Sequence, residues 1–337
     1  MFLSLLSQIY ALIVHIRNLY YDRYAKIIKV DSIVISVGNL SVGGTGKTPF
    51  VQMLSKHFIS KQANIAVIGR GYKRKSKGIV TVCDGKEILS TAEKCGDEML
   101  LLANNLNVPV VVGEKKYMTA TYVAEQYAPD LIIVDDGFQH RKLYRNIDIV
   151  IIDKATLNNN LLPAGRLREP LHSIKRANII ALTGNTLIDE SFTNYINKDA
   201  IIIRVAPIQG TPYNYLNNKH YSIQELENIK KNIVAFAGIA KPERFFDMLQ
   251  NNAFAISTKI EFTDHYNYKI ADILKIIDIA TQNNTKYLAT TEKDAIKFLT
   301  FKELFLSNKI ELLVFPITLS IIEGEKDFYS YLQRFLK

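Results

Sequence analysis

The segment IVISVGNLSVGGTGKTPF, residues 33–50, carries the clearest structural pattern in the chain. Its β-branched run from Ile33 to Val37 predicts a strand, the glycines after it predict a loop, and Gly46-Lys47-Thr48 opens an apolar helical pattern. Backbone N–H groups and the dipole at such a helix start bind phosphate. We therefore expect a phosphate-binding loop in which Lys47 reaches the outer phosphates and the Thr48 hydroxyl binds Mg²⁺.

The loop departs from the usual G-x-x-x-x-G-K-[ST] pattern, because Ser41 stands at the position of the first glycine. Gly43 and Gly44 supply the flexibility instead, and Val42 stands where partitioning-type ATPases usually carry a lysine. An ordinary glycine-rich turn is the alternative interpretation. The strand before the loop and the helix after it favour nucleotide binding, with a predicted ATP-binding loop of Ser41, Val42, Gly43, Gly44, Thr45, Gly46, Lys47 and Thr48.

Two further segments place carboxylates near predicted element ends. The apolar run 131–134 is followed by Asp135, Asp136 and Gly137, an arrangement that delivers carboxylates to a Mg²⁺ ion beside a P-loop, although Asp-Gly alone often marks a turn. Asp97 and Glu98 precede an apolar helical run. Asp97 is either a helix N-cap or a base that accepts a proton from a substrate hydroxyl.

Three segments carry basic or aromatic residues with open roles. Asp264 and His265 lie among aromatic residues in FTDHY, where a lone histidine is more often structural. Arg166 and Arg168 lie in the turn-rich segment LPAGRLREP, and Arg70 opens a basic loop. Arginine suits bidentate phosphate recognition, but each segment reads equally well as a solvated loop.

Apolar residues recur at helical spacing from Phe2 to Leu19, with polar residues between them, which predicts an amphipathic helix. The uncharged run ends at Arg17 and is short for a membrane-spanning helix. No basic stretch precedes this run and no clear cleavage site follows it, so we do not expect a signal peptide. The tyrosines and cations up to Lys29 favour a helix that lies in one leaflet, and a core helix is the alternative.

The 337 residues are enough for two domains, and the net charge of +9 favours anionic partners, unless it reflects genome composition. Two cysteines without C-x-x-C spacing indicate a reducing cytosol. Alternating strands and helices predict an α/β fold with mostly parallel sheets. We expect an interfacial segment over residues 1–30, a P-loop domain over 31–205, a linker over 206–231 and a smaller α/β domain over 232–337. The strand 312–315 is a candidate to return and pair with 201–205, and the last strand and helix are candidates to pack back on the linker or the first domain.

Nine motifs in order resemble the tetraacyldisaccharide 4′-kinases, the lipid A 4′-kinases of Gram-negative bacteria, over almost the whole chain. They are the N-terminal helix, VGNLSVGGTGKTP (37–49), GRGY (69–72), GDE (96–98), DDGFQHRKL (135–143), LPAGRLREP (162–170), AGIAKPERFF (237–246), the DH of FTDHY (264–265) and TEKDAIK (291–297).

The resemblance implies two α/β/α sandwich domains and transfer of the ATP γ-phosphate to the 4′-hydroxyl of a tetraacyl-glucosamine-disaccharide 1-phosphate. It implies a monotopic protein on the cytoplasmic face of the inner membrane, in contact with anionic lipids, with no nucleic acid and no obligate protein partner. Its implied site residues are Lys47 and Thr48 for phosphate and Mg²⁺, Asp135 and Asp136 with Glu98 for the metal, Asp97 as base, His265 as its dyad partner, and Arg70, Gln139, His140, Arg166 and Arg168 for the substrate.

Two other classes stay open. A membrane-recruited regulatory ATPase of the partitioning type would share the P-loop and the helix, although Val42 speaks against it. A nucleic-acid-binding protein is suggested by charge alone, without a zinc finger or a basic recognition helix.

Overall fold

The computed structural model describes residues 2–335, and it forms two compact units. The first runs up to Ile208 and resumes at Thr318, and the second runs from Gln209 to Ile317. The last strand and helix of the chain therefore belong to the first unit.

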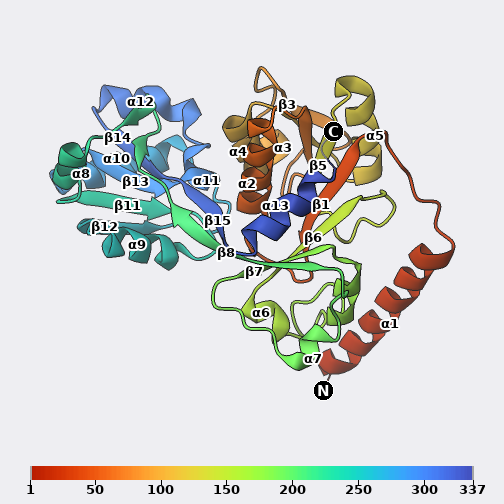
Figure 1. The fold of residues 1–337 in the computed structure, drawn as a ribbon. Helices are drawn as coiled ribbons and strands as arrows, with labels where there is room; N and C mark the ends of the chain where they lie inside the picture. Colours follow the sequence, from red (N-terminus) through yellow and green to blue (C-terminus); the bar gives the residue numbers. More distant parts are fainter. Residues whose placement is uncertain (1, 336–337) are drawn as a thin grey trace. The chain divides into compact units, whose positions relative to one another are not determined.

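The first unit is built on a nine-stranded sheet of order β15-β8-β7-β6-β1-β5-β2-β4-β3 (Figure 1). Its pairs are parallel from β8 through to β4, and β3 is antiparallel to β4. The strands are β1 (Ile33–Asn39), β2 (Ile65–Gly69), β3 (Val80–Asp84), β4 (Pro109–Val112), β5 (Leu131–Asp135), β6 (Ile147–Ile152), β7 (Ile179–Thr183), β8 (Ile201–Gln209) and β15 (Ile317–Glu323).

The central strands β2, β5 and β6 are buried along their whole length because helices cover both faces of the sheet. Val34, Ile132 and Ala66 pack with α5, whereas α2 and α4 pack together on the other side (Figure 1). The helices of this unit are α1 (Phe2–Arg23), α2 (Lys47–Ser60), α3 (Ala92–Cys95), α4 (Asp97–Leu106), α5 (Lys116–Tyr127), α6 (Lys154–Leu157), the 3₁₀ helix η1 (Leu171–Arg176), α7 (Glu190–Thr193) and α13 (Glu325–Gln333).

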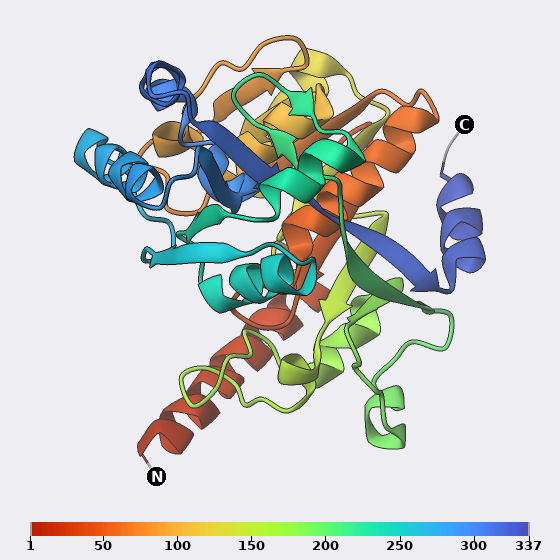
Figure 2. The same ribbon diagram turned by 90° about the vertical axis from the view of Figure 1, so that its left-hand side faces the viewer.

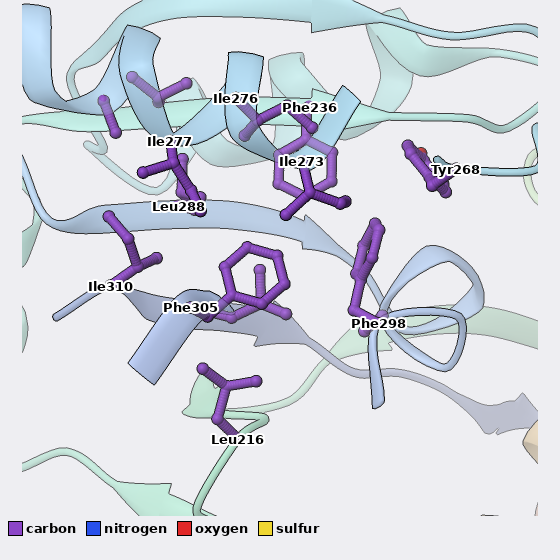
Figure 3. Packing of buried hydrophobic residues seen from close by; sticks show 14 of the residues in the cluster. Leu216, Phe236, Tyr268, Ile273, Ile276, Ile277, Leu288, Phe298, Phe305 and Ile310 are labelled. Carbon is purple, nitrogen blue, oxygen red and sulfur yellow. The ribbon is translucent and has the colours of Figure 1, made fainter. Parts of the chain in front are cut away.

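The second unit has a six-stranded sheet of order β10-β9-β14-β13-β11-β12. Its elements are β9 (Tyr213–Asn214), β10 (Lys219–His220), α8 (Ile223–Ile229), β11 (Ile233–Ala237), α9 (Pro242–Asn251), β12 (Ile256–Glu261), α10 (Ile270–Gln282), β13 (Tyr287–Thr291), α11 (Glu292–Ala295), the 3₁₀ helix η2 (Leu299–Phe301), α12 (Lys302–Ser307) and β14 (Glu311–Phe315). Figure 3 shows its core, where Ile273, Ile276 and Ile277 from α10 meet Phe236 and Leu288 from the strands. The i, i+3, i+4 spacing puts these isoleucines on one helix face.

The predicted α/β class is confirmed, but one strand pairing was wrong. Leu312–Phe315 lies in β14, which pairs with β13 and β9, and the neighbour of β8 is β15. β14 is an almost continuous buried run, as expected of an inner strand, whereas Ile321 is the one buried residue in the half-exposed edge strand β15. Such an edge strand gives a weak pattern in the sequence.

The helix α1 turns polar side chains toward the first unit. Ser7 donates to the Leu161 carbonyl at 2.8 Å, Tyr10 to the Arg168 carbonyl at 3.0 Å, and Arg17 to the Gln139 carbonyl. Leu5 and Leu12 are 58% and 59% exposed on the same helix, which Figure 2 shows as one continuous element. Over residues 2–335 no helix is long and apolar enough to cross a membrane.

Candidate functional site: a P-loop with a paired-carboxylate edge

The P-loop adopts the predicted strand–loop–helix succession. β1 ends at Asn39 and α2 begins at Lys47, with Gly46 in the left-handed region (φ 89°), where a glycine is needed. The Lys47 Nζ lies 3.4 Å from both Asn39 Oδ1 and the Gly43 carbonyl, and Asn39 donates to Thr45 Oγ1 at 2.8 Å. Asn39, at the end of β1, thus links the strand to Thr45 and Lys47 at the far end of the loop.

Asp135 is the last residue of the neighbouring strand β5, and Asp136 directly follows it. β5 lies beside β1, with Asp135 in register with Val37, so both strands deliver their carboxyl ends to one edge. Asp136 accepts two hydrogen bonds from Arg168, each 2.8 Å, and lies 3.7 Å from the Lys47 Nζ. Burial alone would raise the Asp136 pKa, but these cations hold that pKa well below its usual range.

Asp135 lies in the opposite environment. Its side chain is buried, and Oδ1 has no hydrogen-bond partner among the described residues. Burial and the nearby charge of Glu98 raise the pKa of this carboxyl to about 7. The site therefore holds two different carboxyl groups. Asp136 is paired with cations, whereas Oδ1 of Asp135 contacts no cation among the described residues.

Lys116 supports this edge and was missed by the sequence reasoning. Its side chain is fully buried, and Nζ donates to the backbone carbonyls of Asp135 and Asp136, the latter at 2.6 Å. Burial, only partly offset by the two carboxylates, lowers the Lys116 pKa to about 8. These bonds fix the loop in which Asp136 has a φ of 51°. A lysine at a helix start looks solvent-exposed in sequence, so no pattern signalled this role.

The LPAGRLREP segment pairs with the P-loop through its backbone. Val42 N donates to the Arg166 carbonyl at 2.8 Å, and Arg168 N donates to the Leu40 carbonyl at 2.7 Å. Arg168 also reaches Asn39 Oδ1 with its guanidinium. Of the two interpretations of this segment, the solvated loop is therefore wrong for Arg168, which links the P-loop to Asp136.

Gln139 and His140 lie just beyond the carboxylates. Gln139 donates to the Asn39 carbonyl at 2.9 Å. Burial and the Lys116 charge lower the His140 pKa to about 3, so this imidazole is neutral at physiological pH. The charge of Arg70, an exposed residue, also reaches His140 and lowers that pKa further.

Asp97 and Glu98 form the first turn of α4. Gly96 is the N-cap of α4, so the N-cap interpretation of Asp97 is wrong. Asp97 is instead the first residue of the helix, and its side chain is buried. Glu98 approaches closely enough to act on the Asp135 carboxyl. The structure thus brings Lys47, Asp135, Asp136, Arg168 and Glu98 to one edge of the first unit.

His265 lies in the second unit and has a φ of 62°. Its Nε2 is 3.1 Å from the Lys293 Nζ and 3.8 Å from Asp264 Oδ2, and Lys293 also lies 3.3 Å from Asp264 Oδ1. Lys293 was not singled out from the sequence, although it lies in the TEKDAIK motif. Asp264, His265 and Lys293 form one charged cluster within this unit.

The described part of the chain contains no group of three or more His, Cys, Asp or Glu side chains placed to hold a metal ion. A P-loop does not need such a cage, because Mg²⁺ there is held by one or two protein oxygens, the substrate phosphates and water.

Several known proteins are similar to this chain. A family model described as tetraacyldisaccharide-1-P 4′-kinase matches residues 1–337. A tetraacyldisaccharide 4′-kinase from Halothermothrix orenii is 32% identical over 99% of this chain and 92% of its own length, and one from Aquifex aeolicus is 36% identical over 91% and 92%. A crystal structure described as the "apo" form of LpxK from Aquifex aeolicus in complex with ATP superposes with a TM-score of 0.82 at 31% identity, covering 98% of each chain.

Proposed function

The chain belongs to the tetraacyldisaccharide-1-P 4′-kinase family, and from that premise we propose that its P-loop site transfers the γ-phosphate of ATP to the 4′-hydroxyl of a tetraacyl-glucosamine-disaccharide 1-phosphate. The product is the 4′-phosphorylated precursor of lipid A. The observation that carries the proposal is the P-loop beside the Asp135–Asp136–Arg168 edge, in a chain that matches the family from end to end.

Binding of ATP is supported by the loop itself and by the complex with ATP of the similar protein from Aquifex aeolicus. Residues 41–48 lie between the end of β1 and the first turn of α2, where backbone N–H groups face an anion. Lys47 lies over the loop at Gly43 and Asn39, within reach of the outer phosphates. Positioning and charge neutralisation supply most of the catalysis in phosphoryl transfer.

The residues present fit Mg²⁺. The buried Oδ1 of Asp135 has no partner among the described residues, and Glu98 and the Thr48 hydroxyl offer further oxygen ligands. Asp136 is committed to Arg168 and Lys47, so Asp135 is the better candidate for direct contact. When bound there, Mg²⁺ would neutralise part of the negative charge of the phosphates.

The transfer step itself needs a base for the acceptor hydroxyl. The bond from the γ-phosphorus to the β,γ-bridging oxygen breaks as the bond to the 4′-oxygen forms, and ADP leaves. We assign the hydroxyl proton to the Asp97 carboxylate and propose that His265, from the second unit, orients and polarises Asp97 when the units close over the substrates. Closure would also exclude water from ATP.

The acceptor is amphiphilic, so we propose that the protein works on the cytoplasmic face of the bacterial inner membrane. The exposed leucines and isoleucines of α1 would lie among the acyl chains, and the exposed cations Arg23, Lys26 and Lys29 would face anionic headgroups. Replacing Leu5, Leu12 and Ile16 by serine should then weaken flotation with vesicles that contain anionic phospholipid. Unchanged flotation, with Lys198→Ala as a control at an exposed loop, would contradict this role for α1.

The experiment that tests the activity follows γ-labelled ATP into lipid. Wild-type protein in mild detergent would receive Mg²⁺ and the tetraacyldisaccharide 1-phosphate, with Lys47→Ala as the inactive variant and Lys61→Ala, beyond the other end of α2, as the matched control. We expect label in a more polar glycolipid with wild type and Lys61→Ala only. Label released solely as free phosphate would contradict the kinase and indicate a membrane-recruited regulatory ATPase.

A further inference from the structure

Arg166 is a cation that lies against the P-loop without a carboxylate partner among residues 2–335. The neighbouring cations Arg168 and Lys47 both approach Asp136, whereas the exposed Arg166 guanidinium makes no ion pair in the described chain. A free guanidinium beside a phosphate-binding loop has an unused fork of N–H donors suited to phosphate oxygens.

The backbone of Arg166 is fixed on both sides. Its carbonyl accepts from Val42 N at 2.8 Å, and its N–H donates to Asn159 Oδ1 at 2.7 Å. The next residue, Leu167, forms a bridge with Ser41. The segment therefore runs along the P-loop like a short added strand, and Arg166 keeps its place relative to the loop.

The side chain of Arg166 lies over Gly43. A methyl group added to Gly43 would come within 2.2 Å of the Arg166 Nη2. The Lys47 Nζ approaches the carbonyl of the same Gly43 at 3.4 Å. The tips of Lys47 and Arg166 thus meet at one residue of the loop, and Lys47 is the side chain that reaches the outer phosphates.

We propose that Arg166 is a catalytic arginine, supplied by the chain's own loop, whose guanidinium binds the γ-phosphoryl oxygens during transfer. The proposal rests on the proposed function and adds a role within it. Negative charge spreads over the equatorial oxygens of the transferring group, and a guanidinium at that point stabilises the transition state more than the ground state. Arg166 acts through its charge and its N–H donors and forms no covalent bond.

The test compares Arg166→Ala and Arg166→Lys with Lys198→Ala. Lys198 precedes β8, so it lies at the edge of the sheet opposite the P-loop, and it loses the same charge. Two quantities are measured for each variant: the turnover number, and the ratio of the dissociation constant for ADP with Mg²⁺ to that for ADP with Mg²⁺ and aluminium fluoride, which mimics the transferring phosphoryl group.

We expect Arg166→Ala to lower turnover by about 100- to 1,000-fold and to abolish most of the tightening by aluminium fluoride, with ADP affinity changed by less than about threefold. Arg166→Lys should restore part of the turnover and part of the tightening by aluminium fluoride, because lysine returns the positive charge without the paired N–H donors of a guanidinium. Turnover within twofold of wild type, or an unchanged fluoride ratio together with a raised KM for the lipid acceptor, would overturn the proposal.

The two hypotheses fail in different ways. If wild-type protein phosphorylates no lipid, the proposed acceptor is wrong, but the fluoride ratio still reports whether Arg166 binds a transferring phosphoryl group. If the lipid is phosphorylated and the ratio is the same in wild type and Arg166→Ala, only the role of Arg166 is wrong.

Discussion

Asp135 and Asp136 are adjacent in the chain and lie in opposite electrostatic environments. Asp136 faces outward to Arg168 and Lys47, which stabilise its charge. The Asp135 side chain is buried, and the negative charge of Glu98 acts on it. The reversal follows from the left-handed backbone at Asp136, which the buried Lys116 holds in place. Two identical side chains therefore serve different purposes.

This difference predicts distinct phenotypes for the two asparagine variants. Asp135→Asn should raise the Mg²⁺ concentration needed for half-maximal turnover by at least about tenfold, because it removes a ligand charge. Asp136→Asn should instead lower turnover at saturating Mg²⁺, because Arg168 and Lys47 lose their partner. Titration of turnover with Mg²⁺ measures both, and equal Mg²⁺ requirements in the two variants would contradict the assignment of Asp135.

The roles of the P-loop residues and of Asp135 and Asp136 could be predicted because short, local sequence patterns indicate them. A strand, glycines and a lysine in succession leave few alternatives. Lys116 and Lys293 could not be found this way. Lys116 bonds to carbonyls about 20 residues away, and Lys293 contacts a histidine 28 residues away, so only the folded chain brings them together.

Among the elements, α13 shows how the end of the chain supports the P-loop helix. Phe328 of α13 is fully buried and makes an edge-to-face contact with Phe50 of α2, with ring centroids 6.2 Å apart. α13 follows the edge strand β15, whose pattern is weak, so its return to the first unit was left open by the sequence. The contact between Phe328 and Phe50 shows that α13 packs on α2 in the first unit.

Phe328→Ala should lower the free energy of unfolding by about 3–5 kcal/mol, because it removes a buried ring and leaves a cavity beside α2. Urea unfolding measures the change. Lys326→Ala, an exposed position on the same helix, is the control and should change the stability little. A loss below about 1 kcal/mol for Phe328→Ala would contradict the packing of α13 on α2.

The same pair of helices predicts a pH dependence of stability. His57 of α2 stacks on Tyr329 of α13 at 4.1 Å, and its buried Nε2 has no partner among the described residues. Burial, and then the charge of Lys61, lower the His57 pKa from 6.5. The His57 side chain therefore binds a proton more readily in the unfolded chain than in the folded one. The contribution of His57 to the free energy of unfolding is fully present above pH 6.5 and is lost as the pH falls below it.

The variant His57→Phe keeps an aromatic ring against Tyr329 and removes the titrating group. Its free energy of unfolding should fall less than that of wild type between about pH 7.5 and about pH 5.5. Chemical denaturation at both pH values measures the difference. The same fall in both proteins would show that His57 does not titrate differently on folding.

At the scale of the whole molecule, the candidate base and its partner come from separate units. Asp97 lies in α4 of the first unit and His265 in the charged cluster of the second. Only the family resemblance links the two residues in the sequence, since spacing alone does not connect residues 168 positions apart. The α/β class of both units was predictable because buried parallel strands have a strong pattern.

Asp97→Ala and His265→Ala should each lower turnover by about 100-fold or more, with ATP affinity nearly unchanged, because they act on the acceptor hydroxyl and not on the nucleotide. The double variant should be little worse than the worse single variant if the two side chains act as a unit. Steady-state kinetics and ATP binding by calorimetry measure these effects. Additive losses, or parallel losses of ATP affinity, would contradict a shared role.

The central claim is that one particular hydroxyl of a lipid disaccharide receives the γ-phosphate. The most direct measurement is a two-dimensional ³¹P–¹H correlation spectrum of the purified glycolipid product made by wild-type protein with the tetraacyldisaccharide 1-phosphate, ATP and Mg²⁺. Kinase activity at this site predicts a new phosphomonoester signal coupled to the proton on carbon 4′, and no such signal with Lys47→Ala. A new signal coupled to any other ring proton, or an unmodified glycolipid while ATP is consumed, would contradict it.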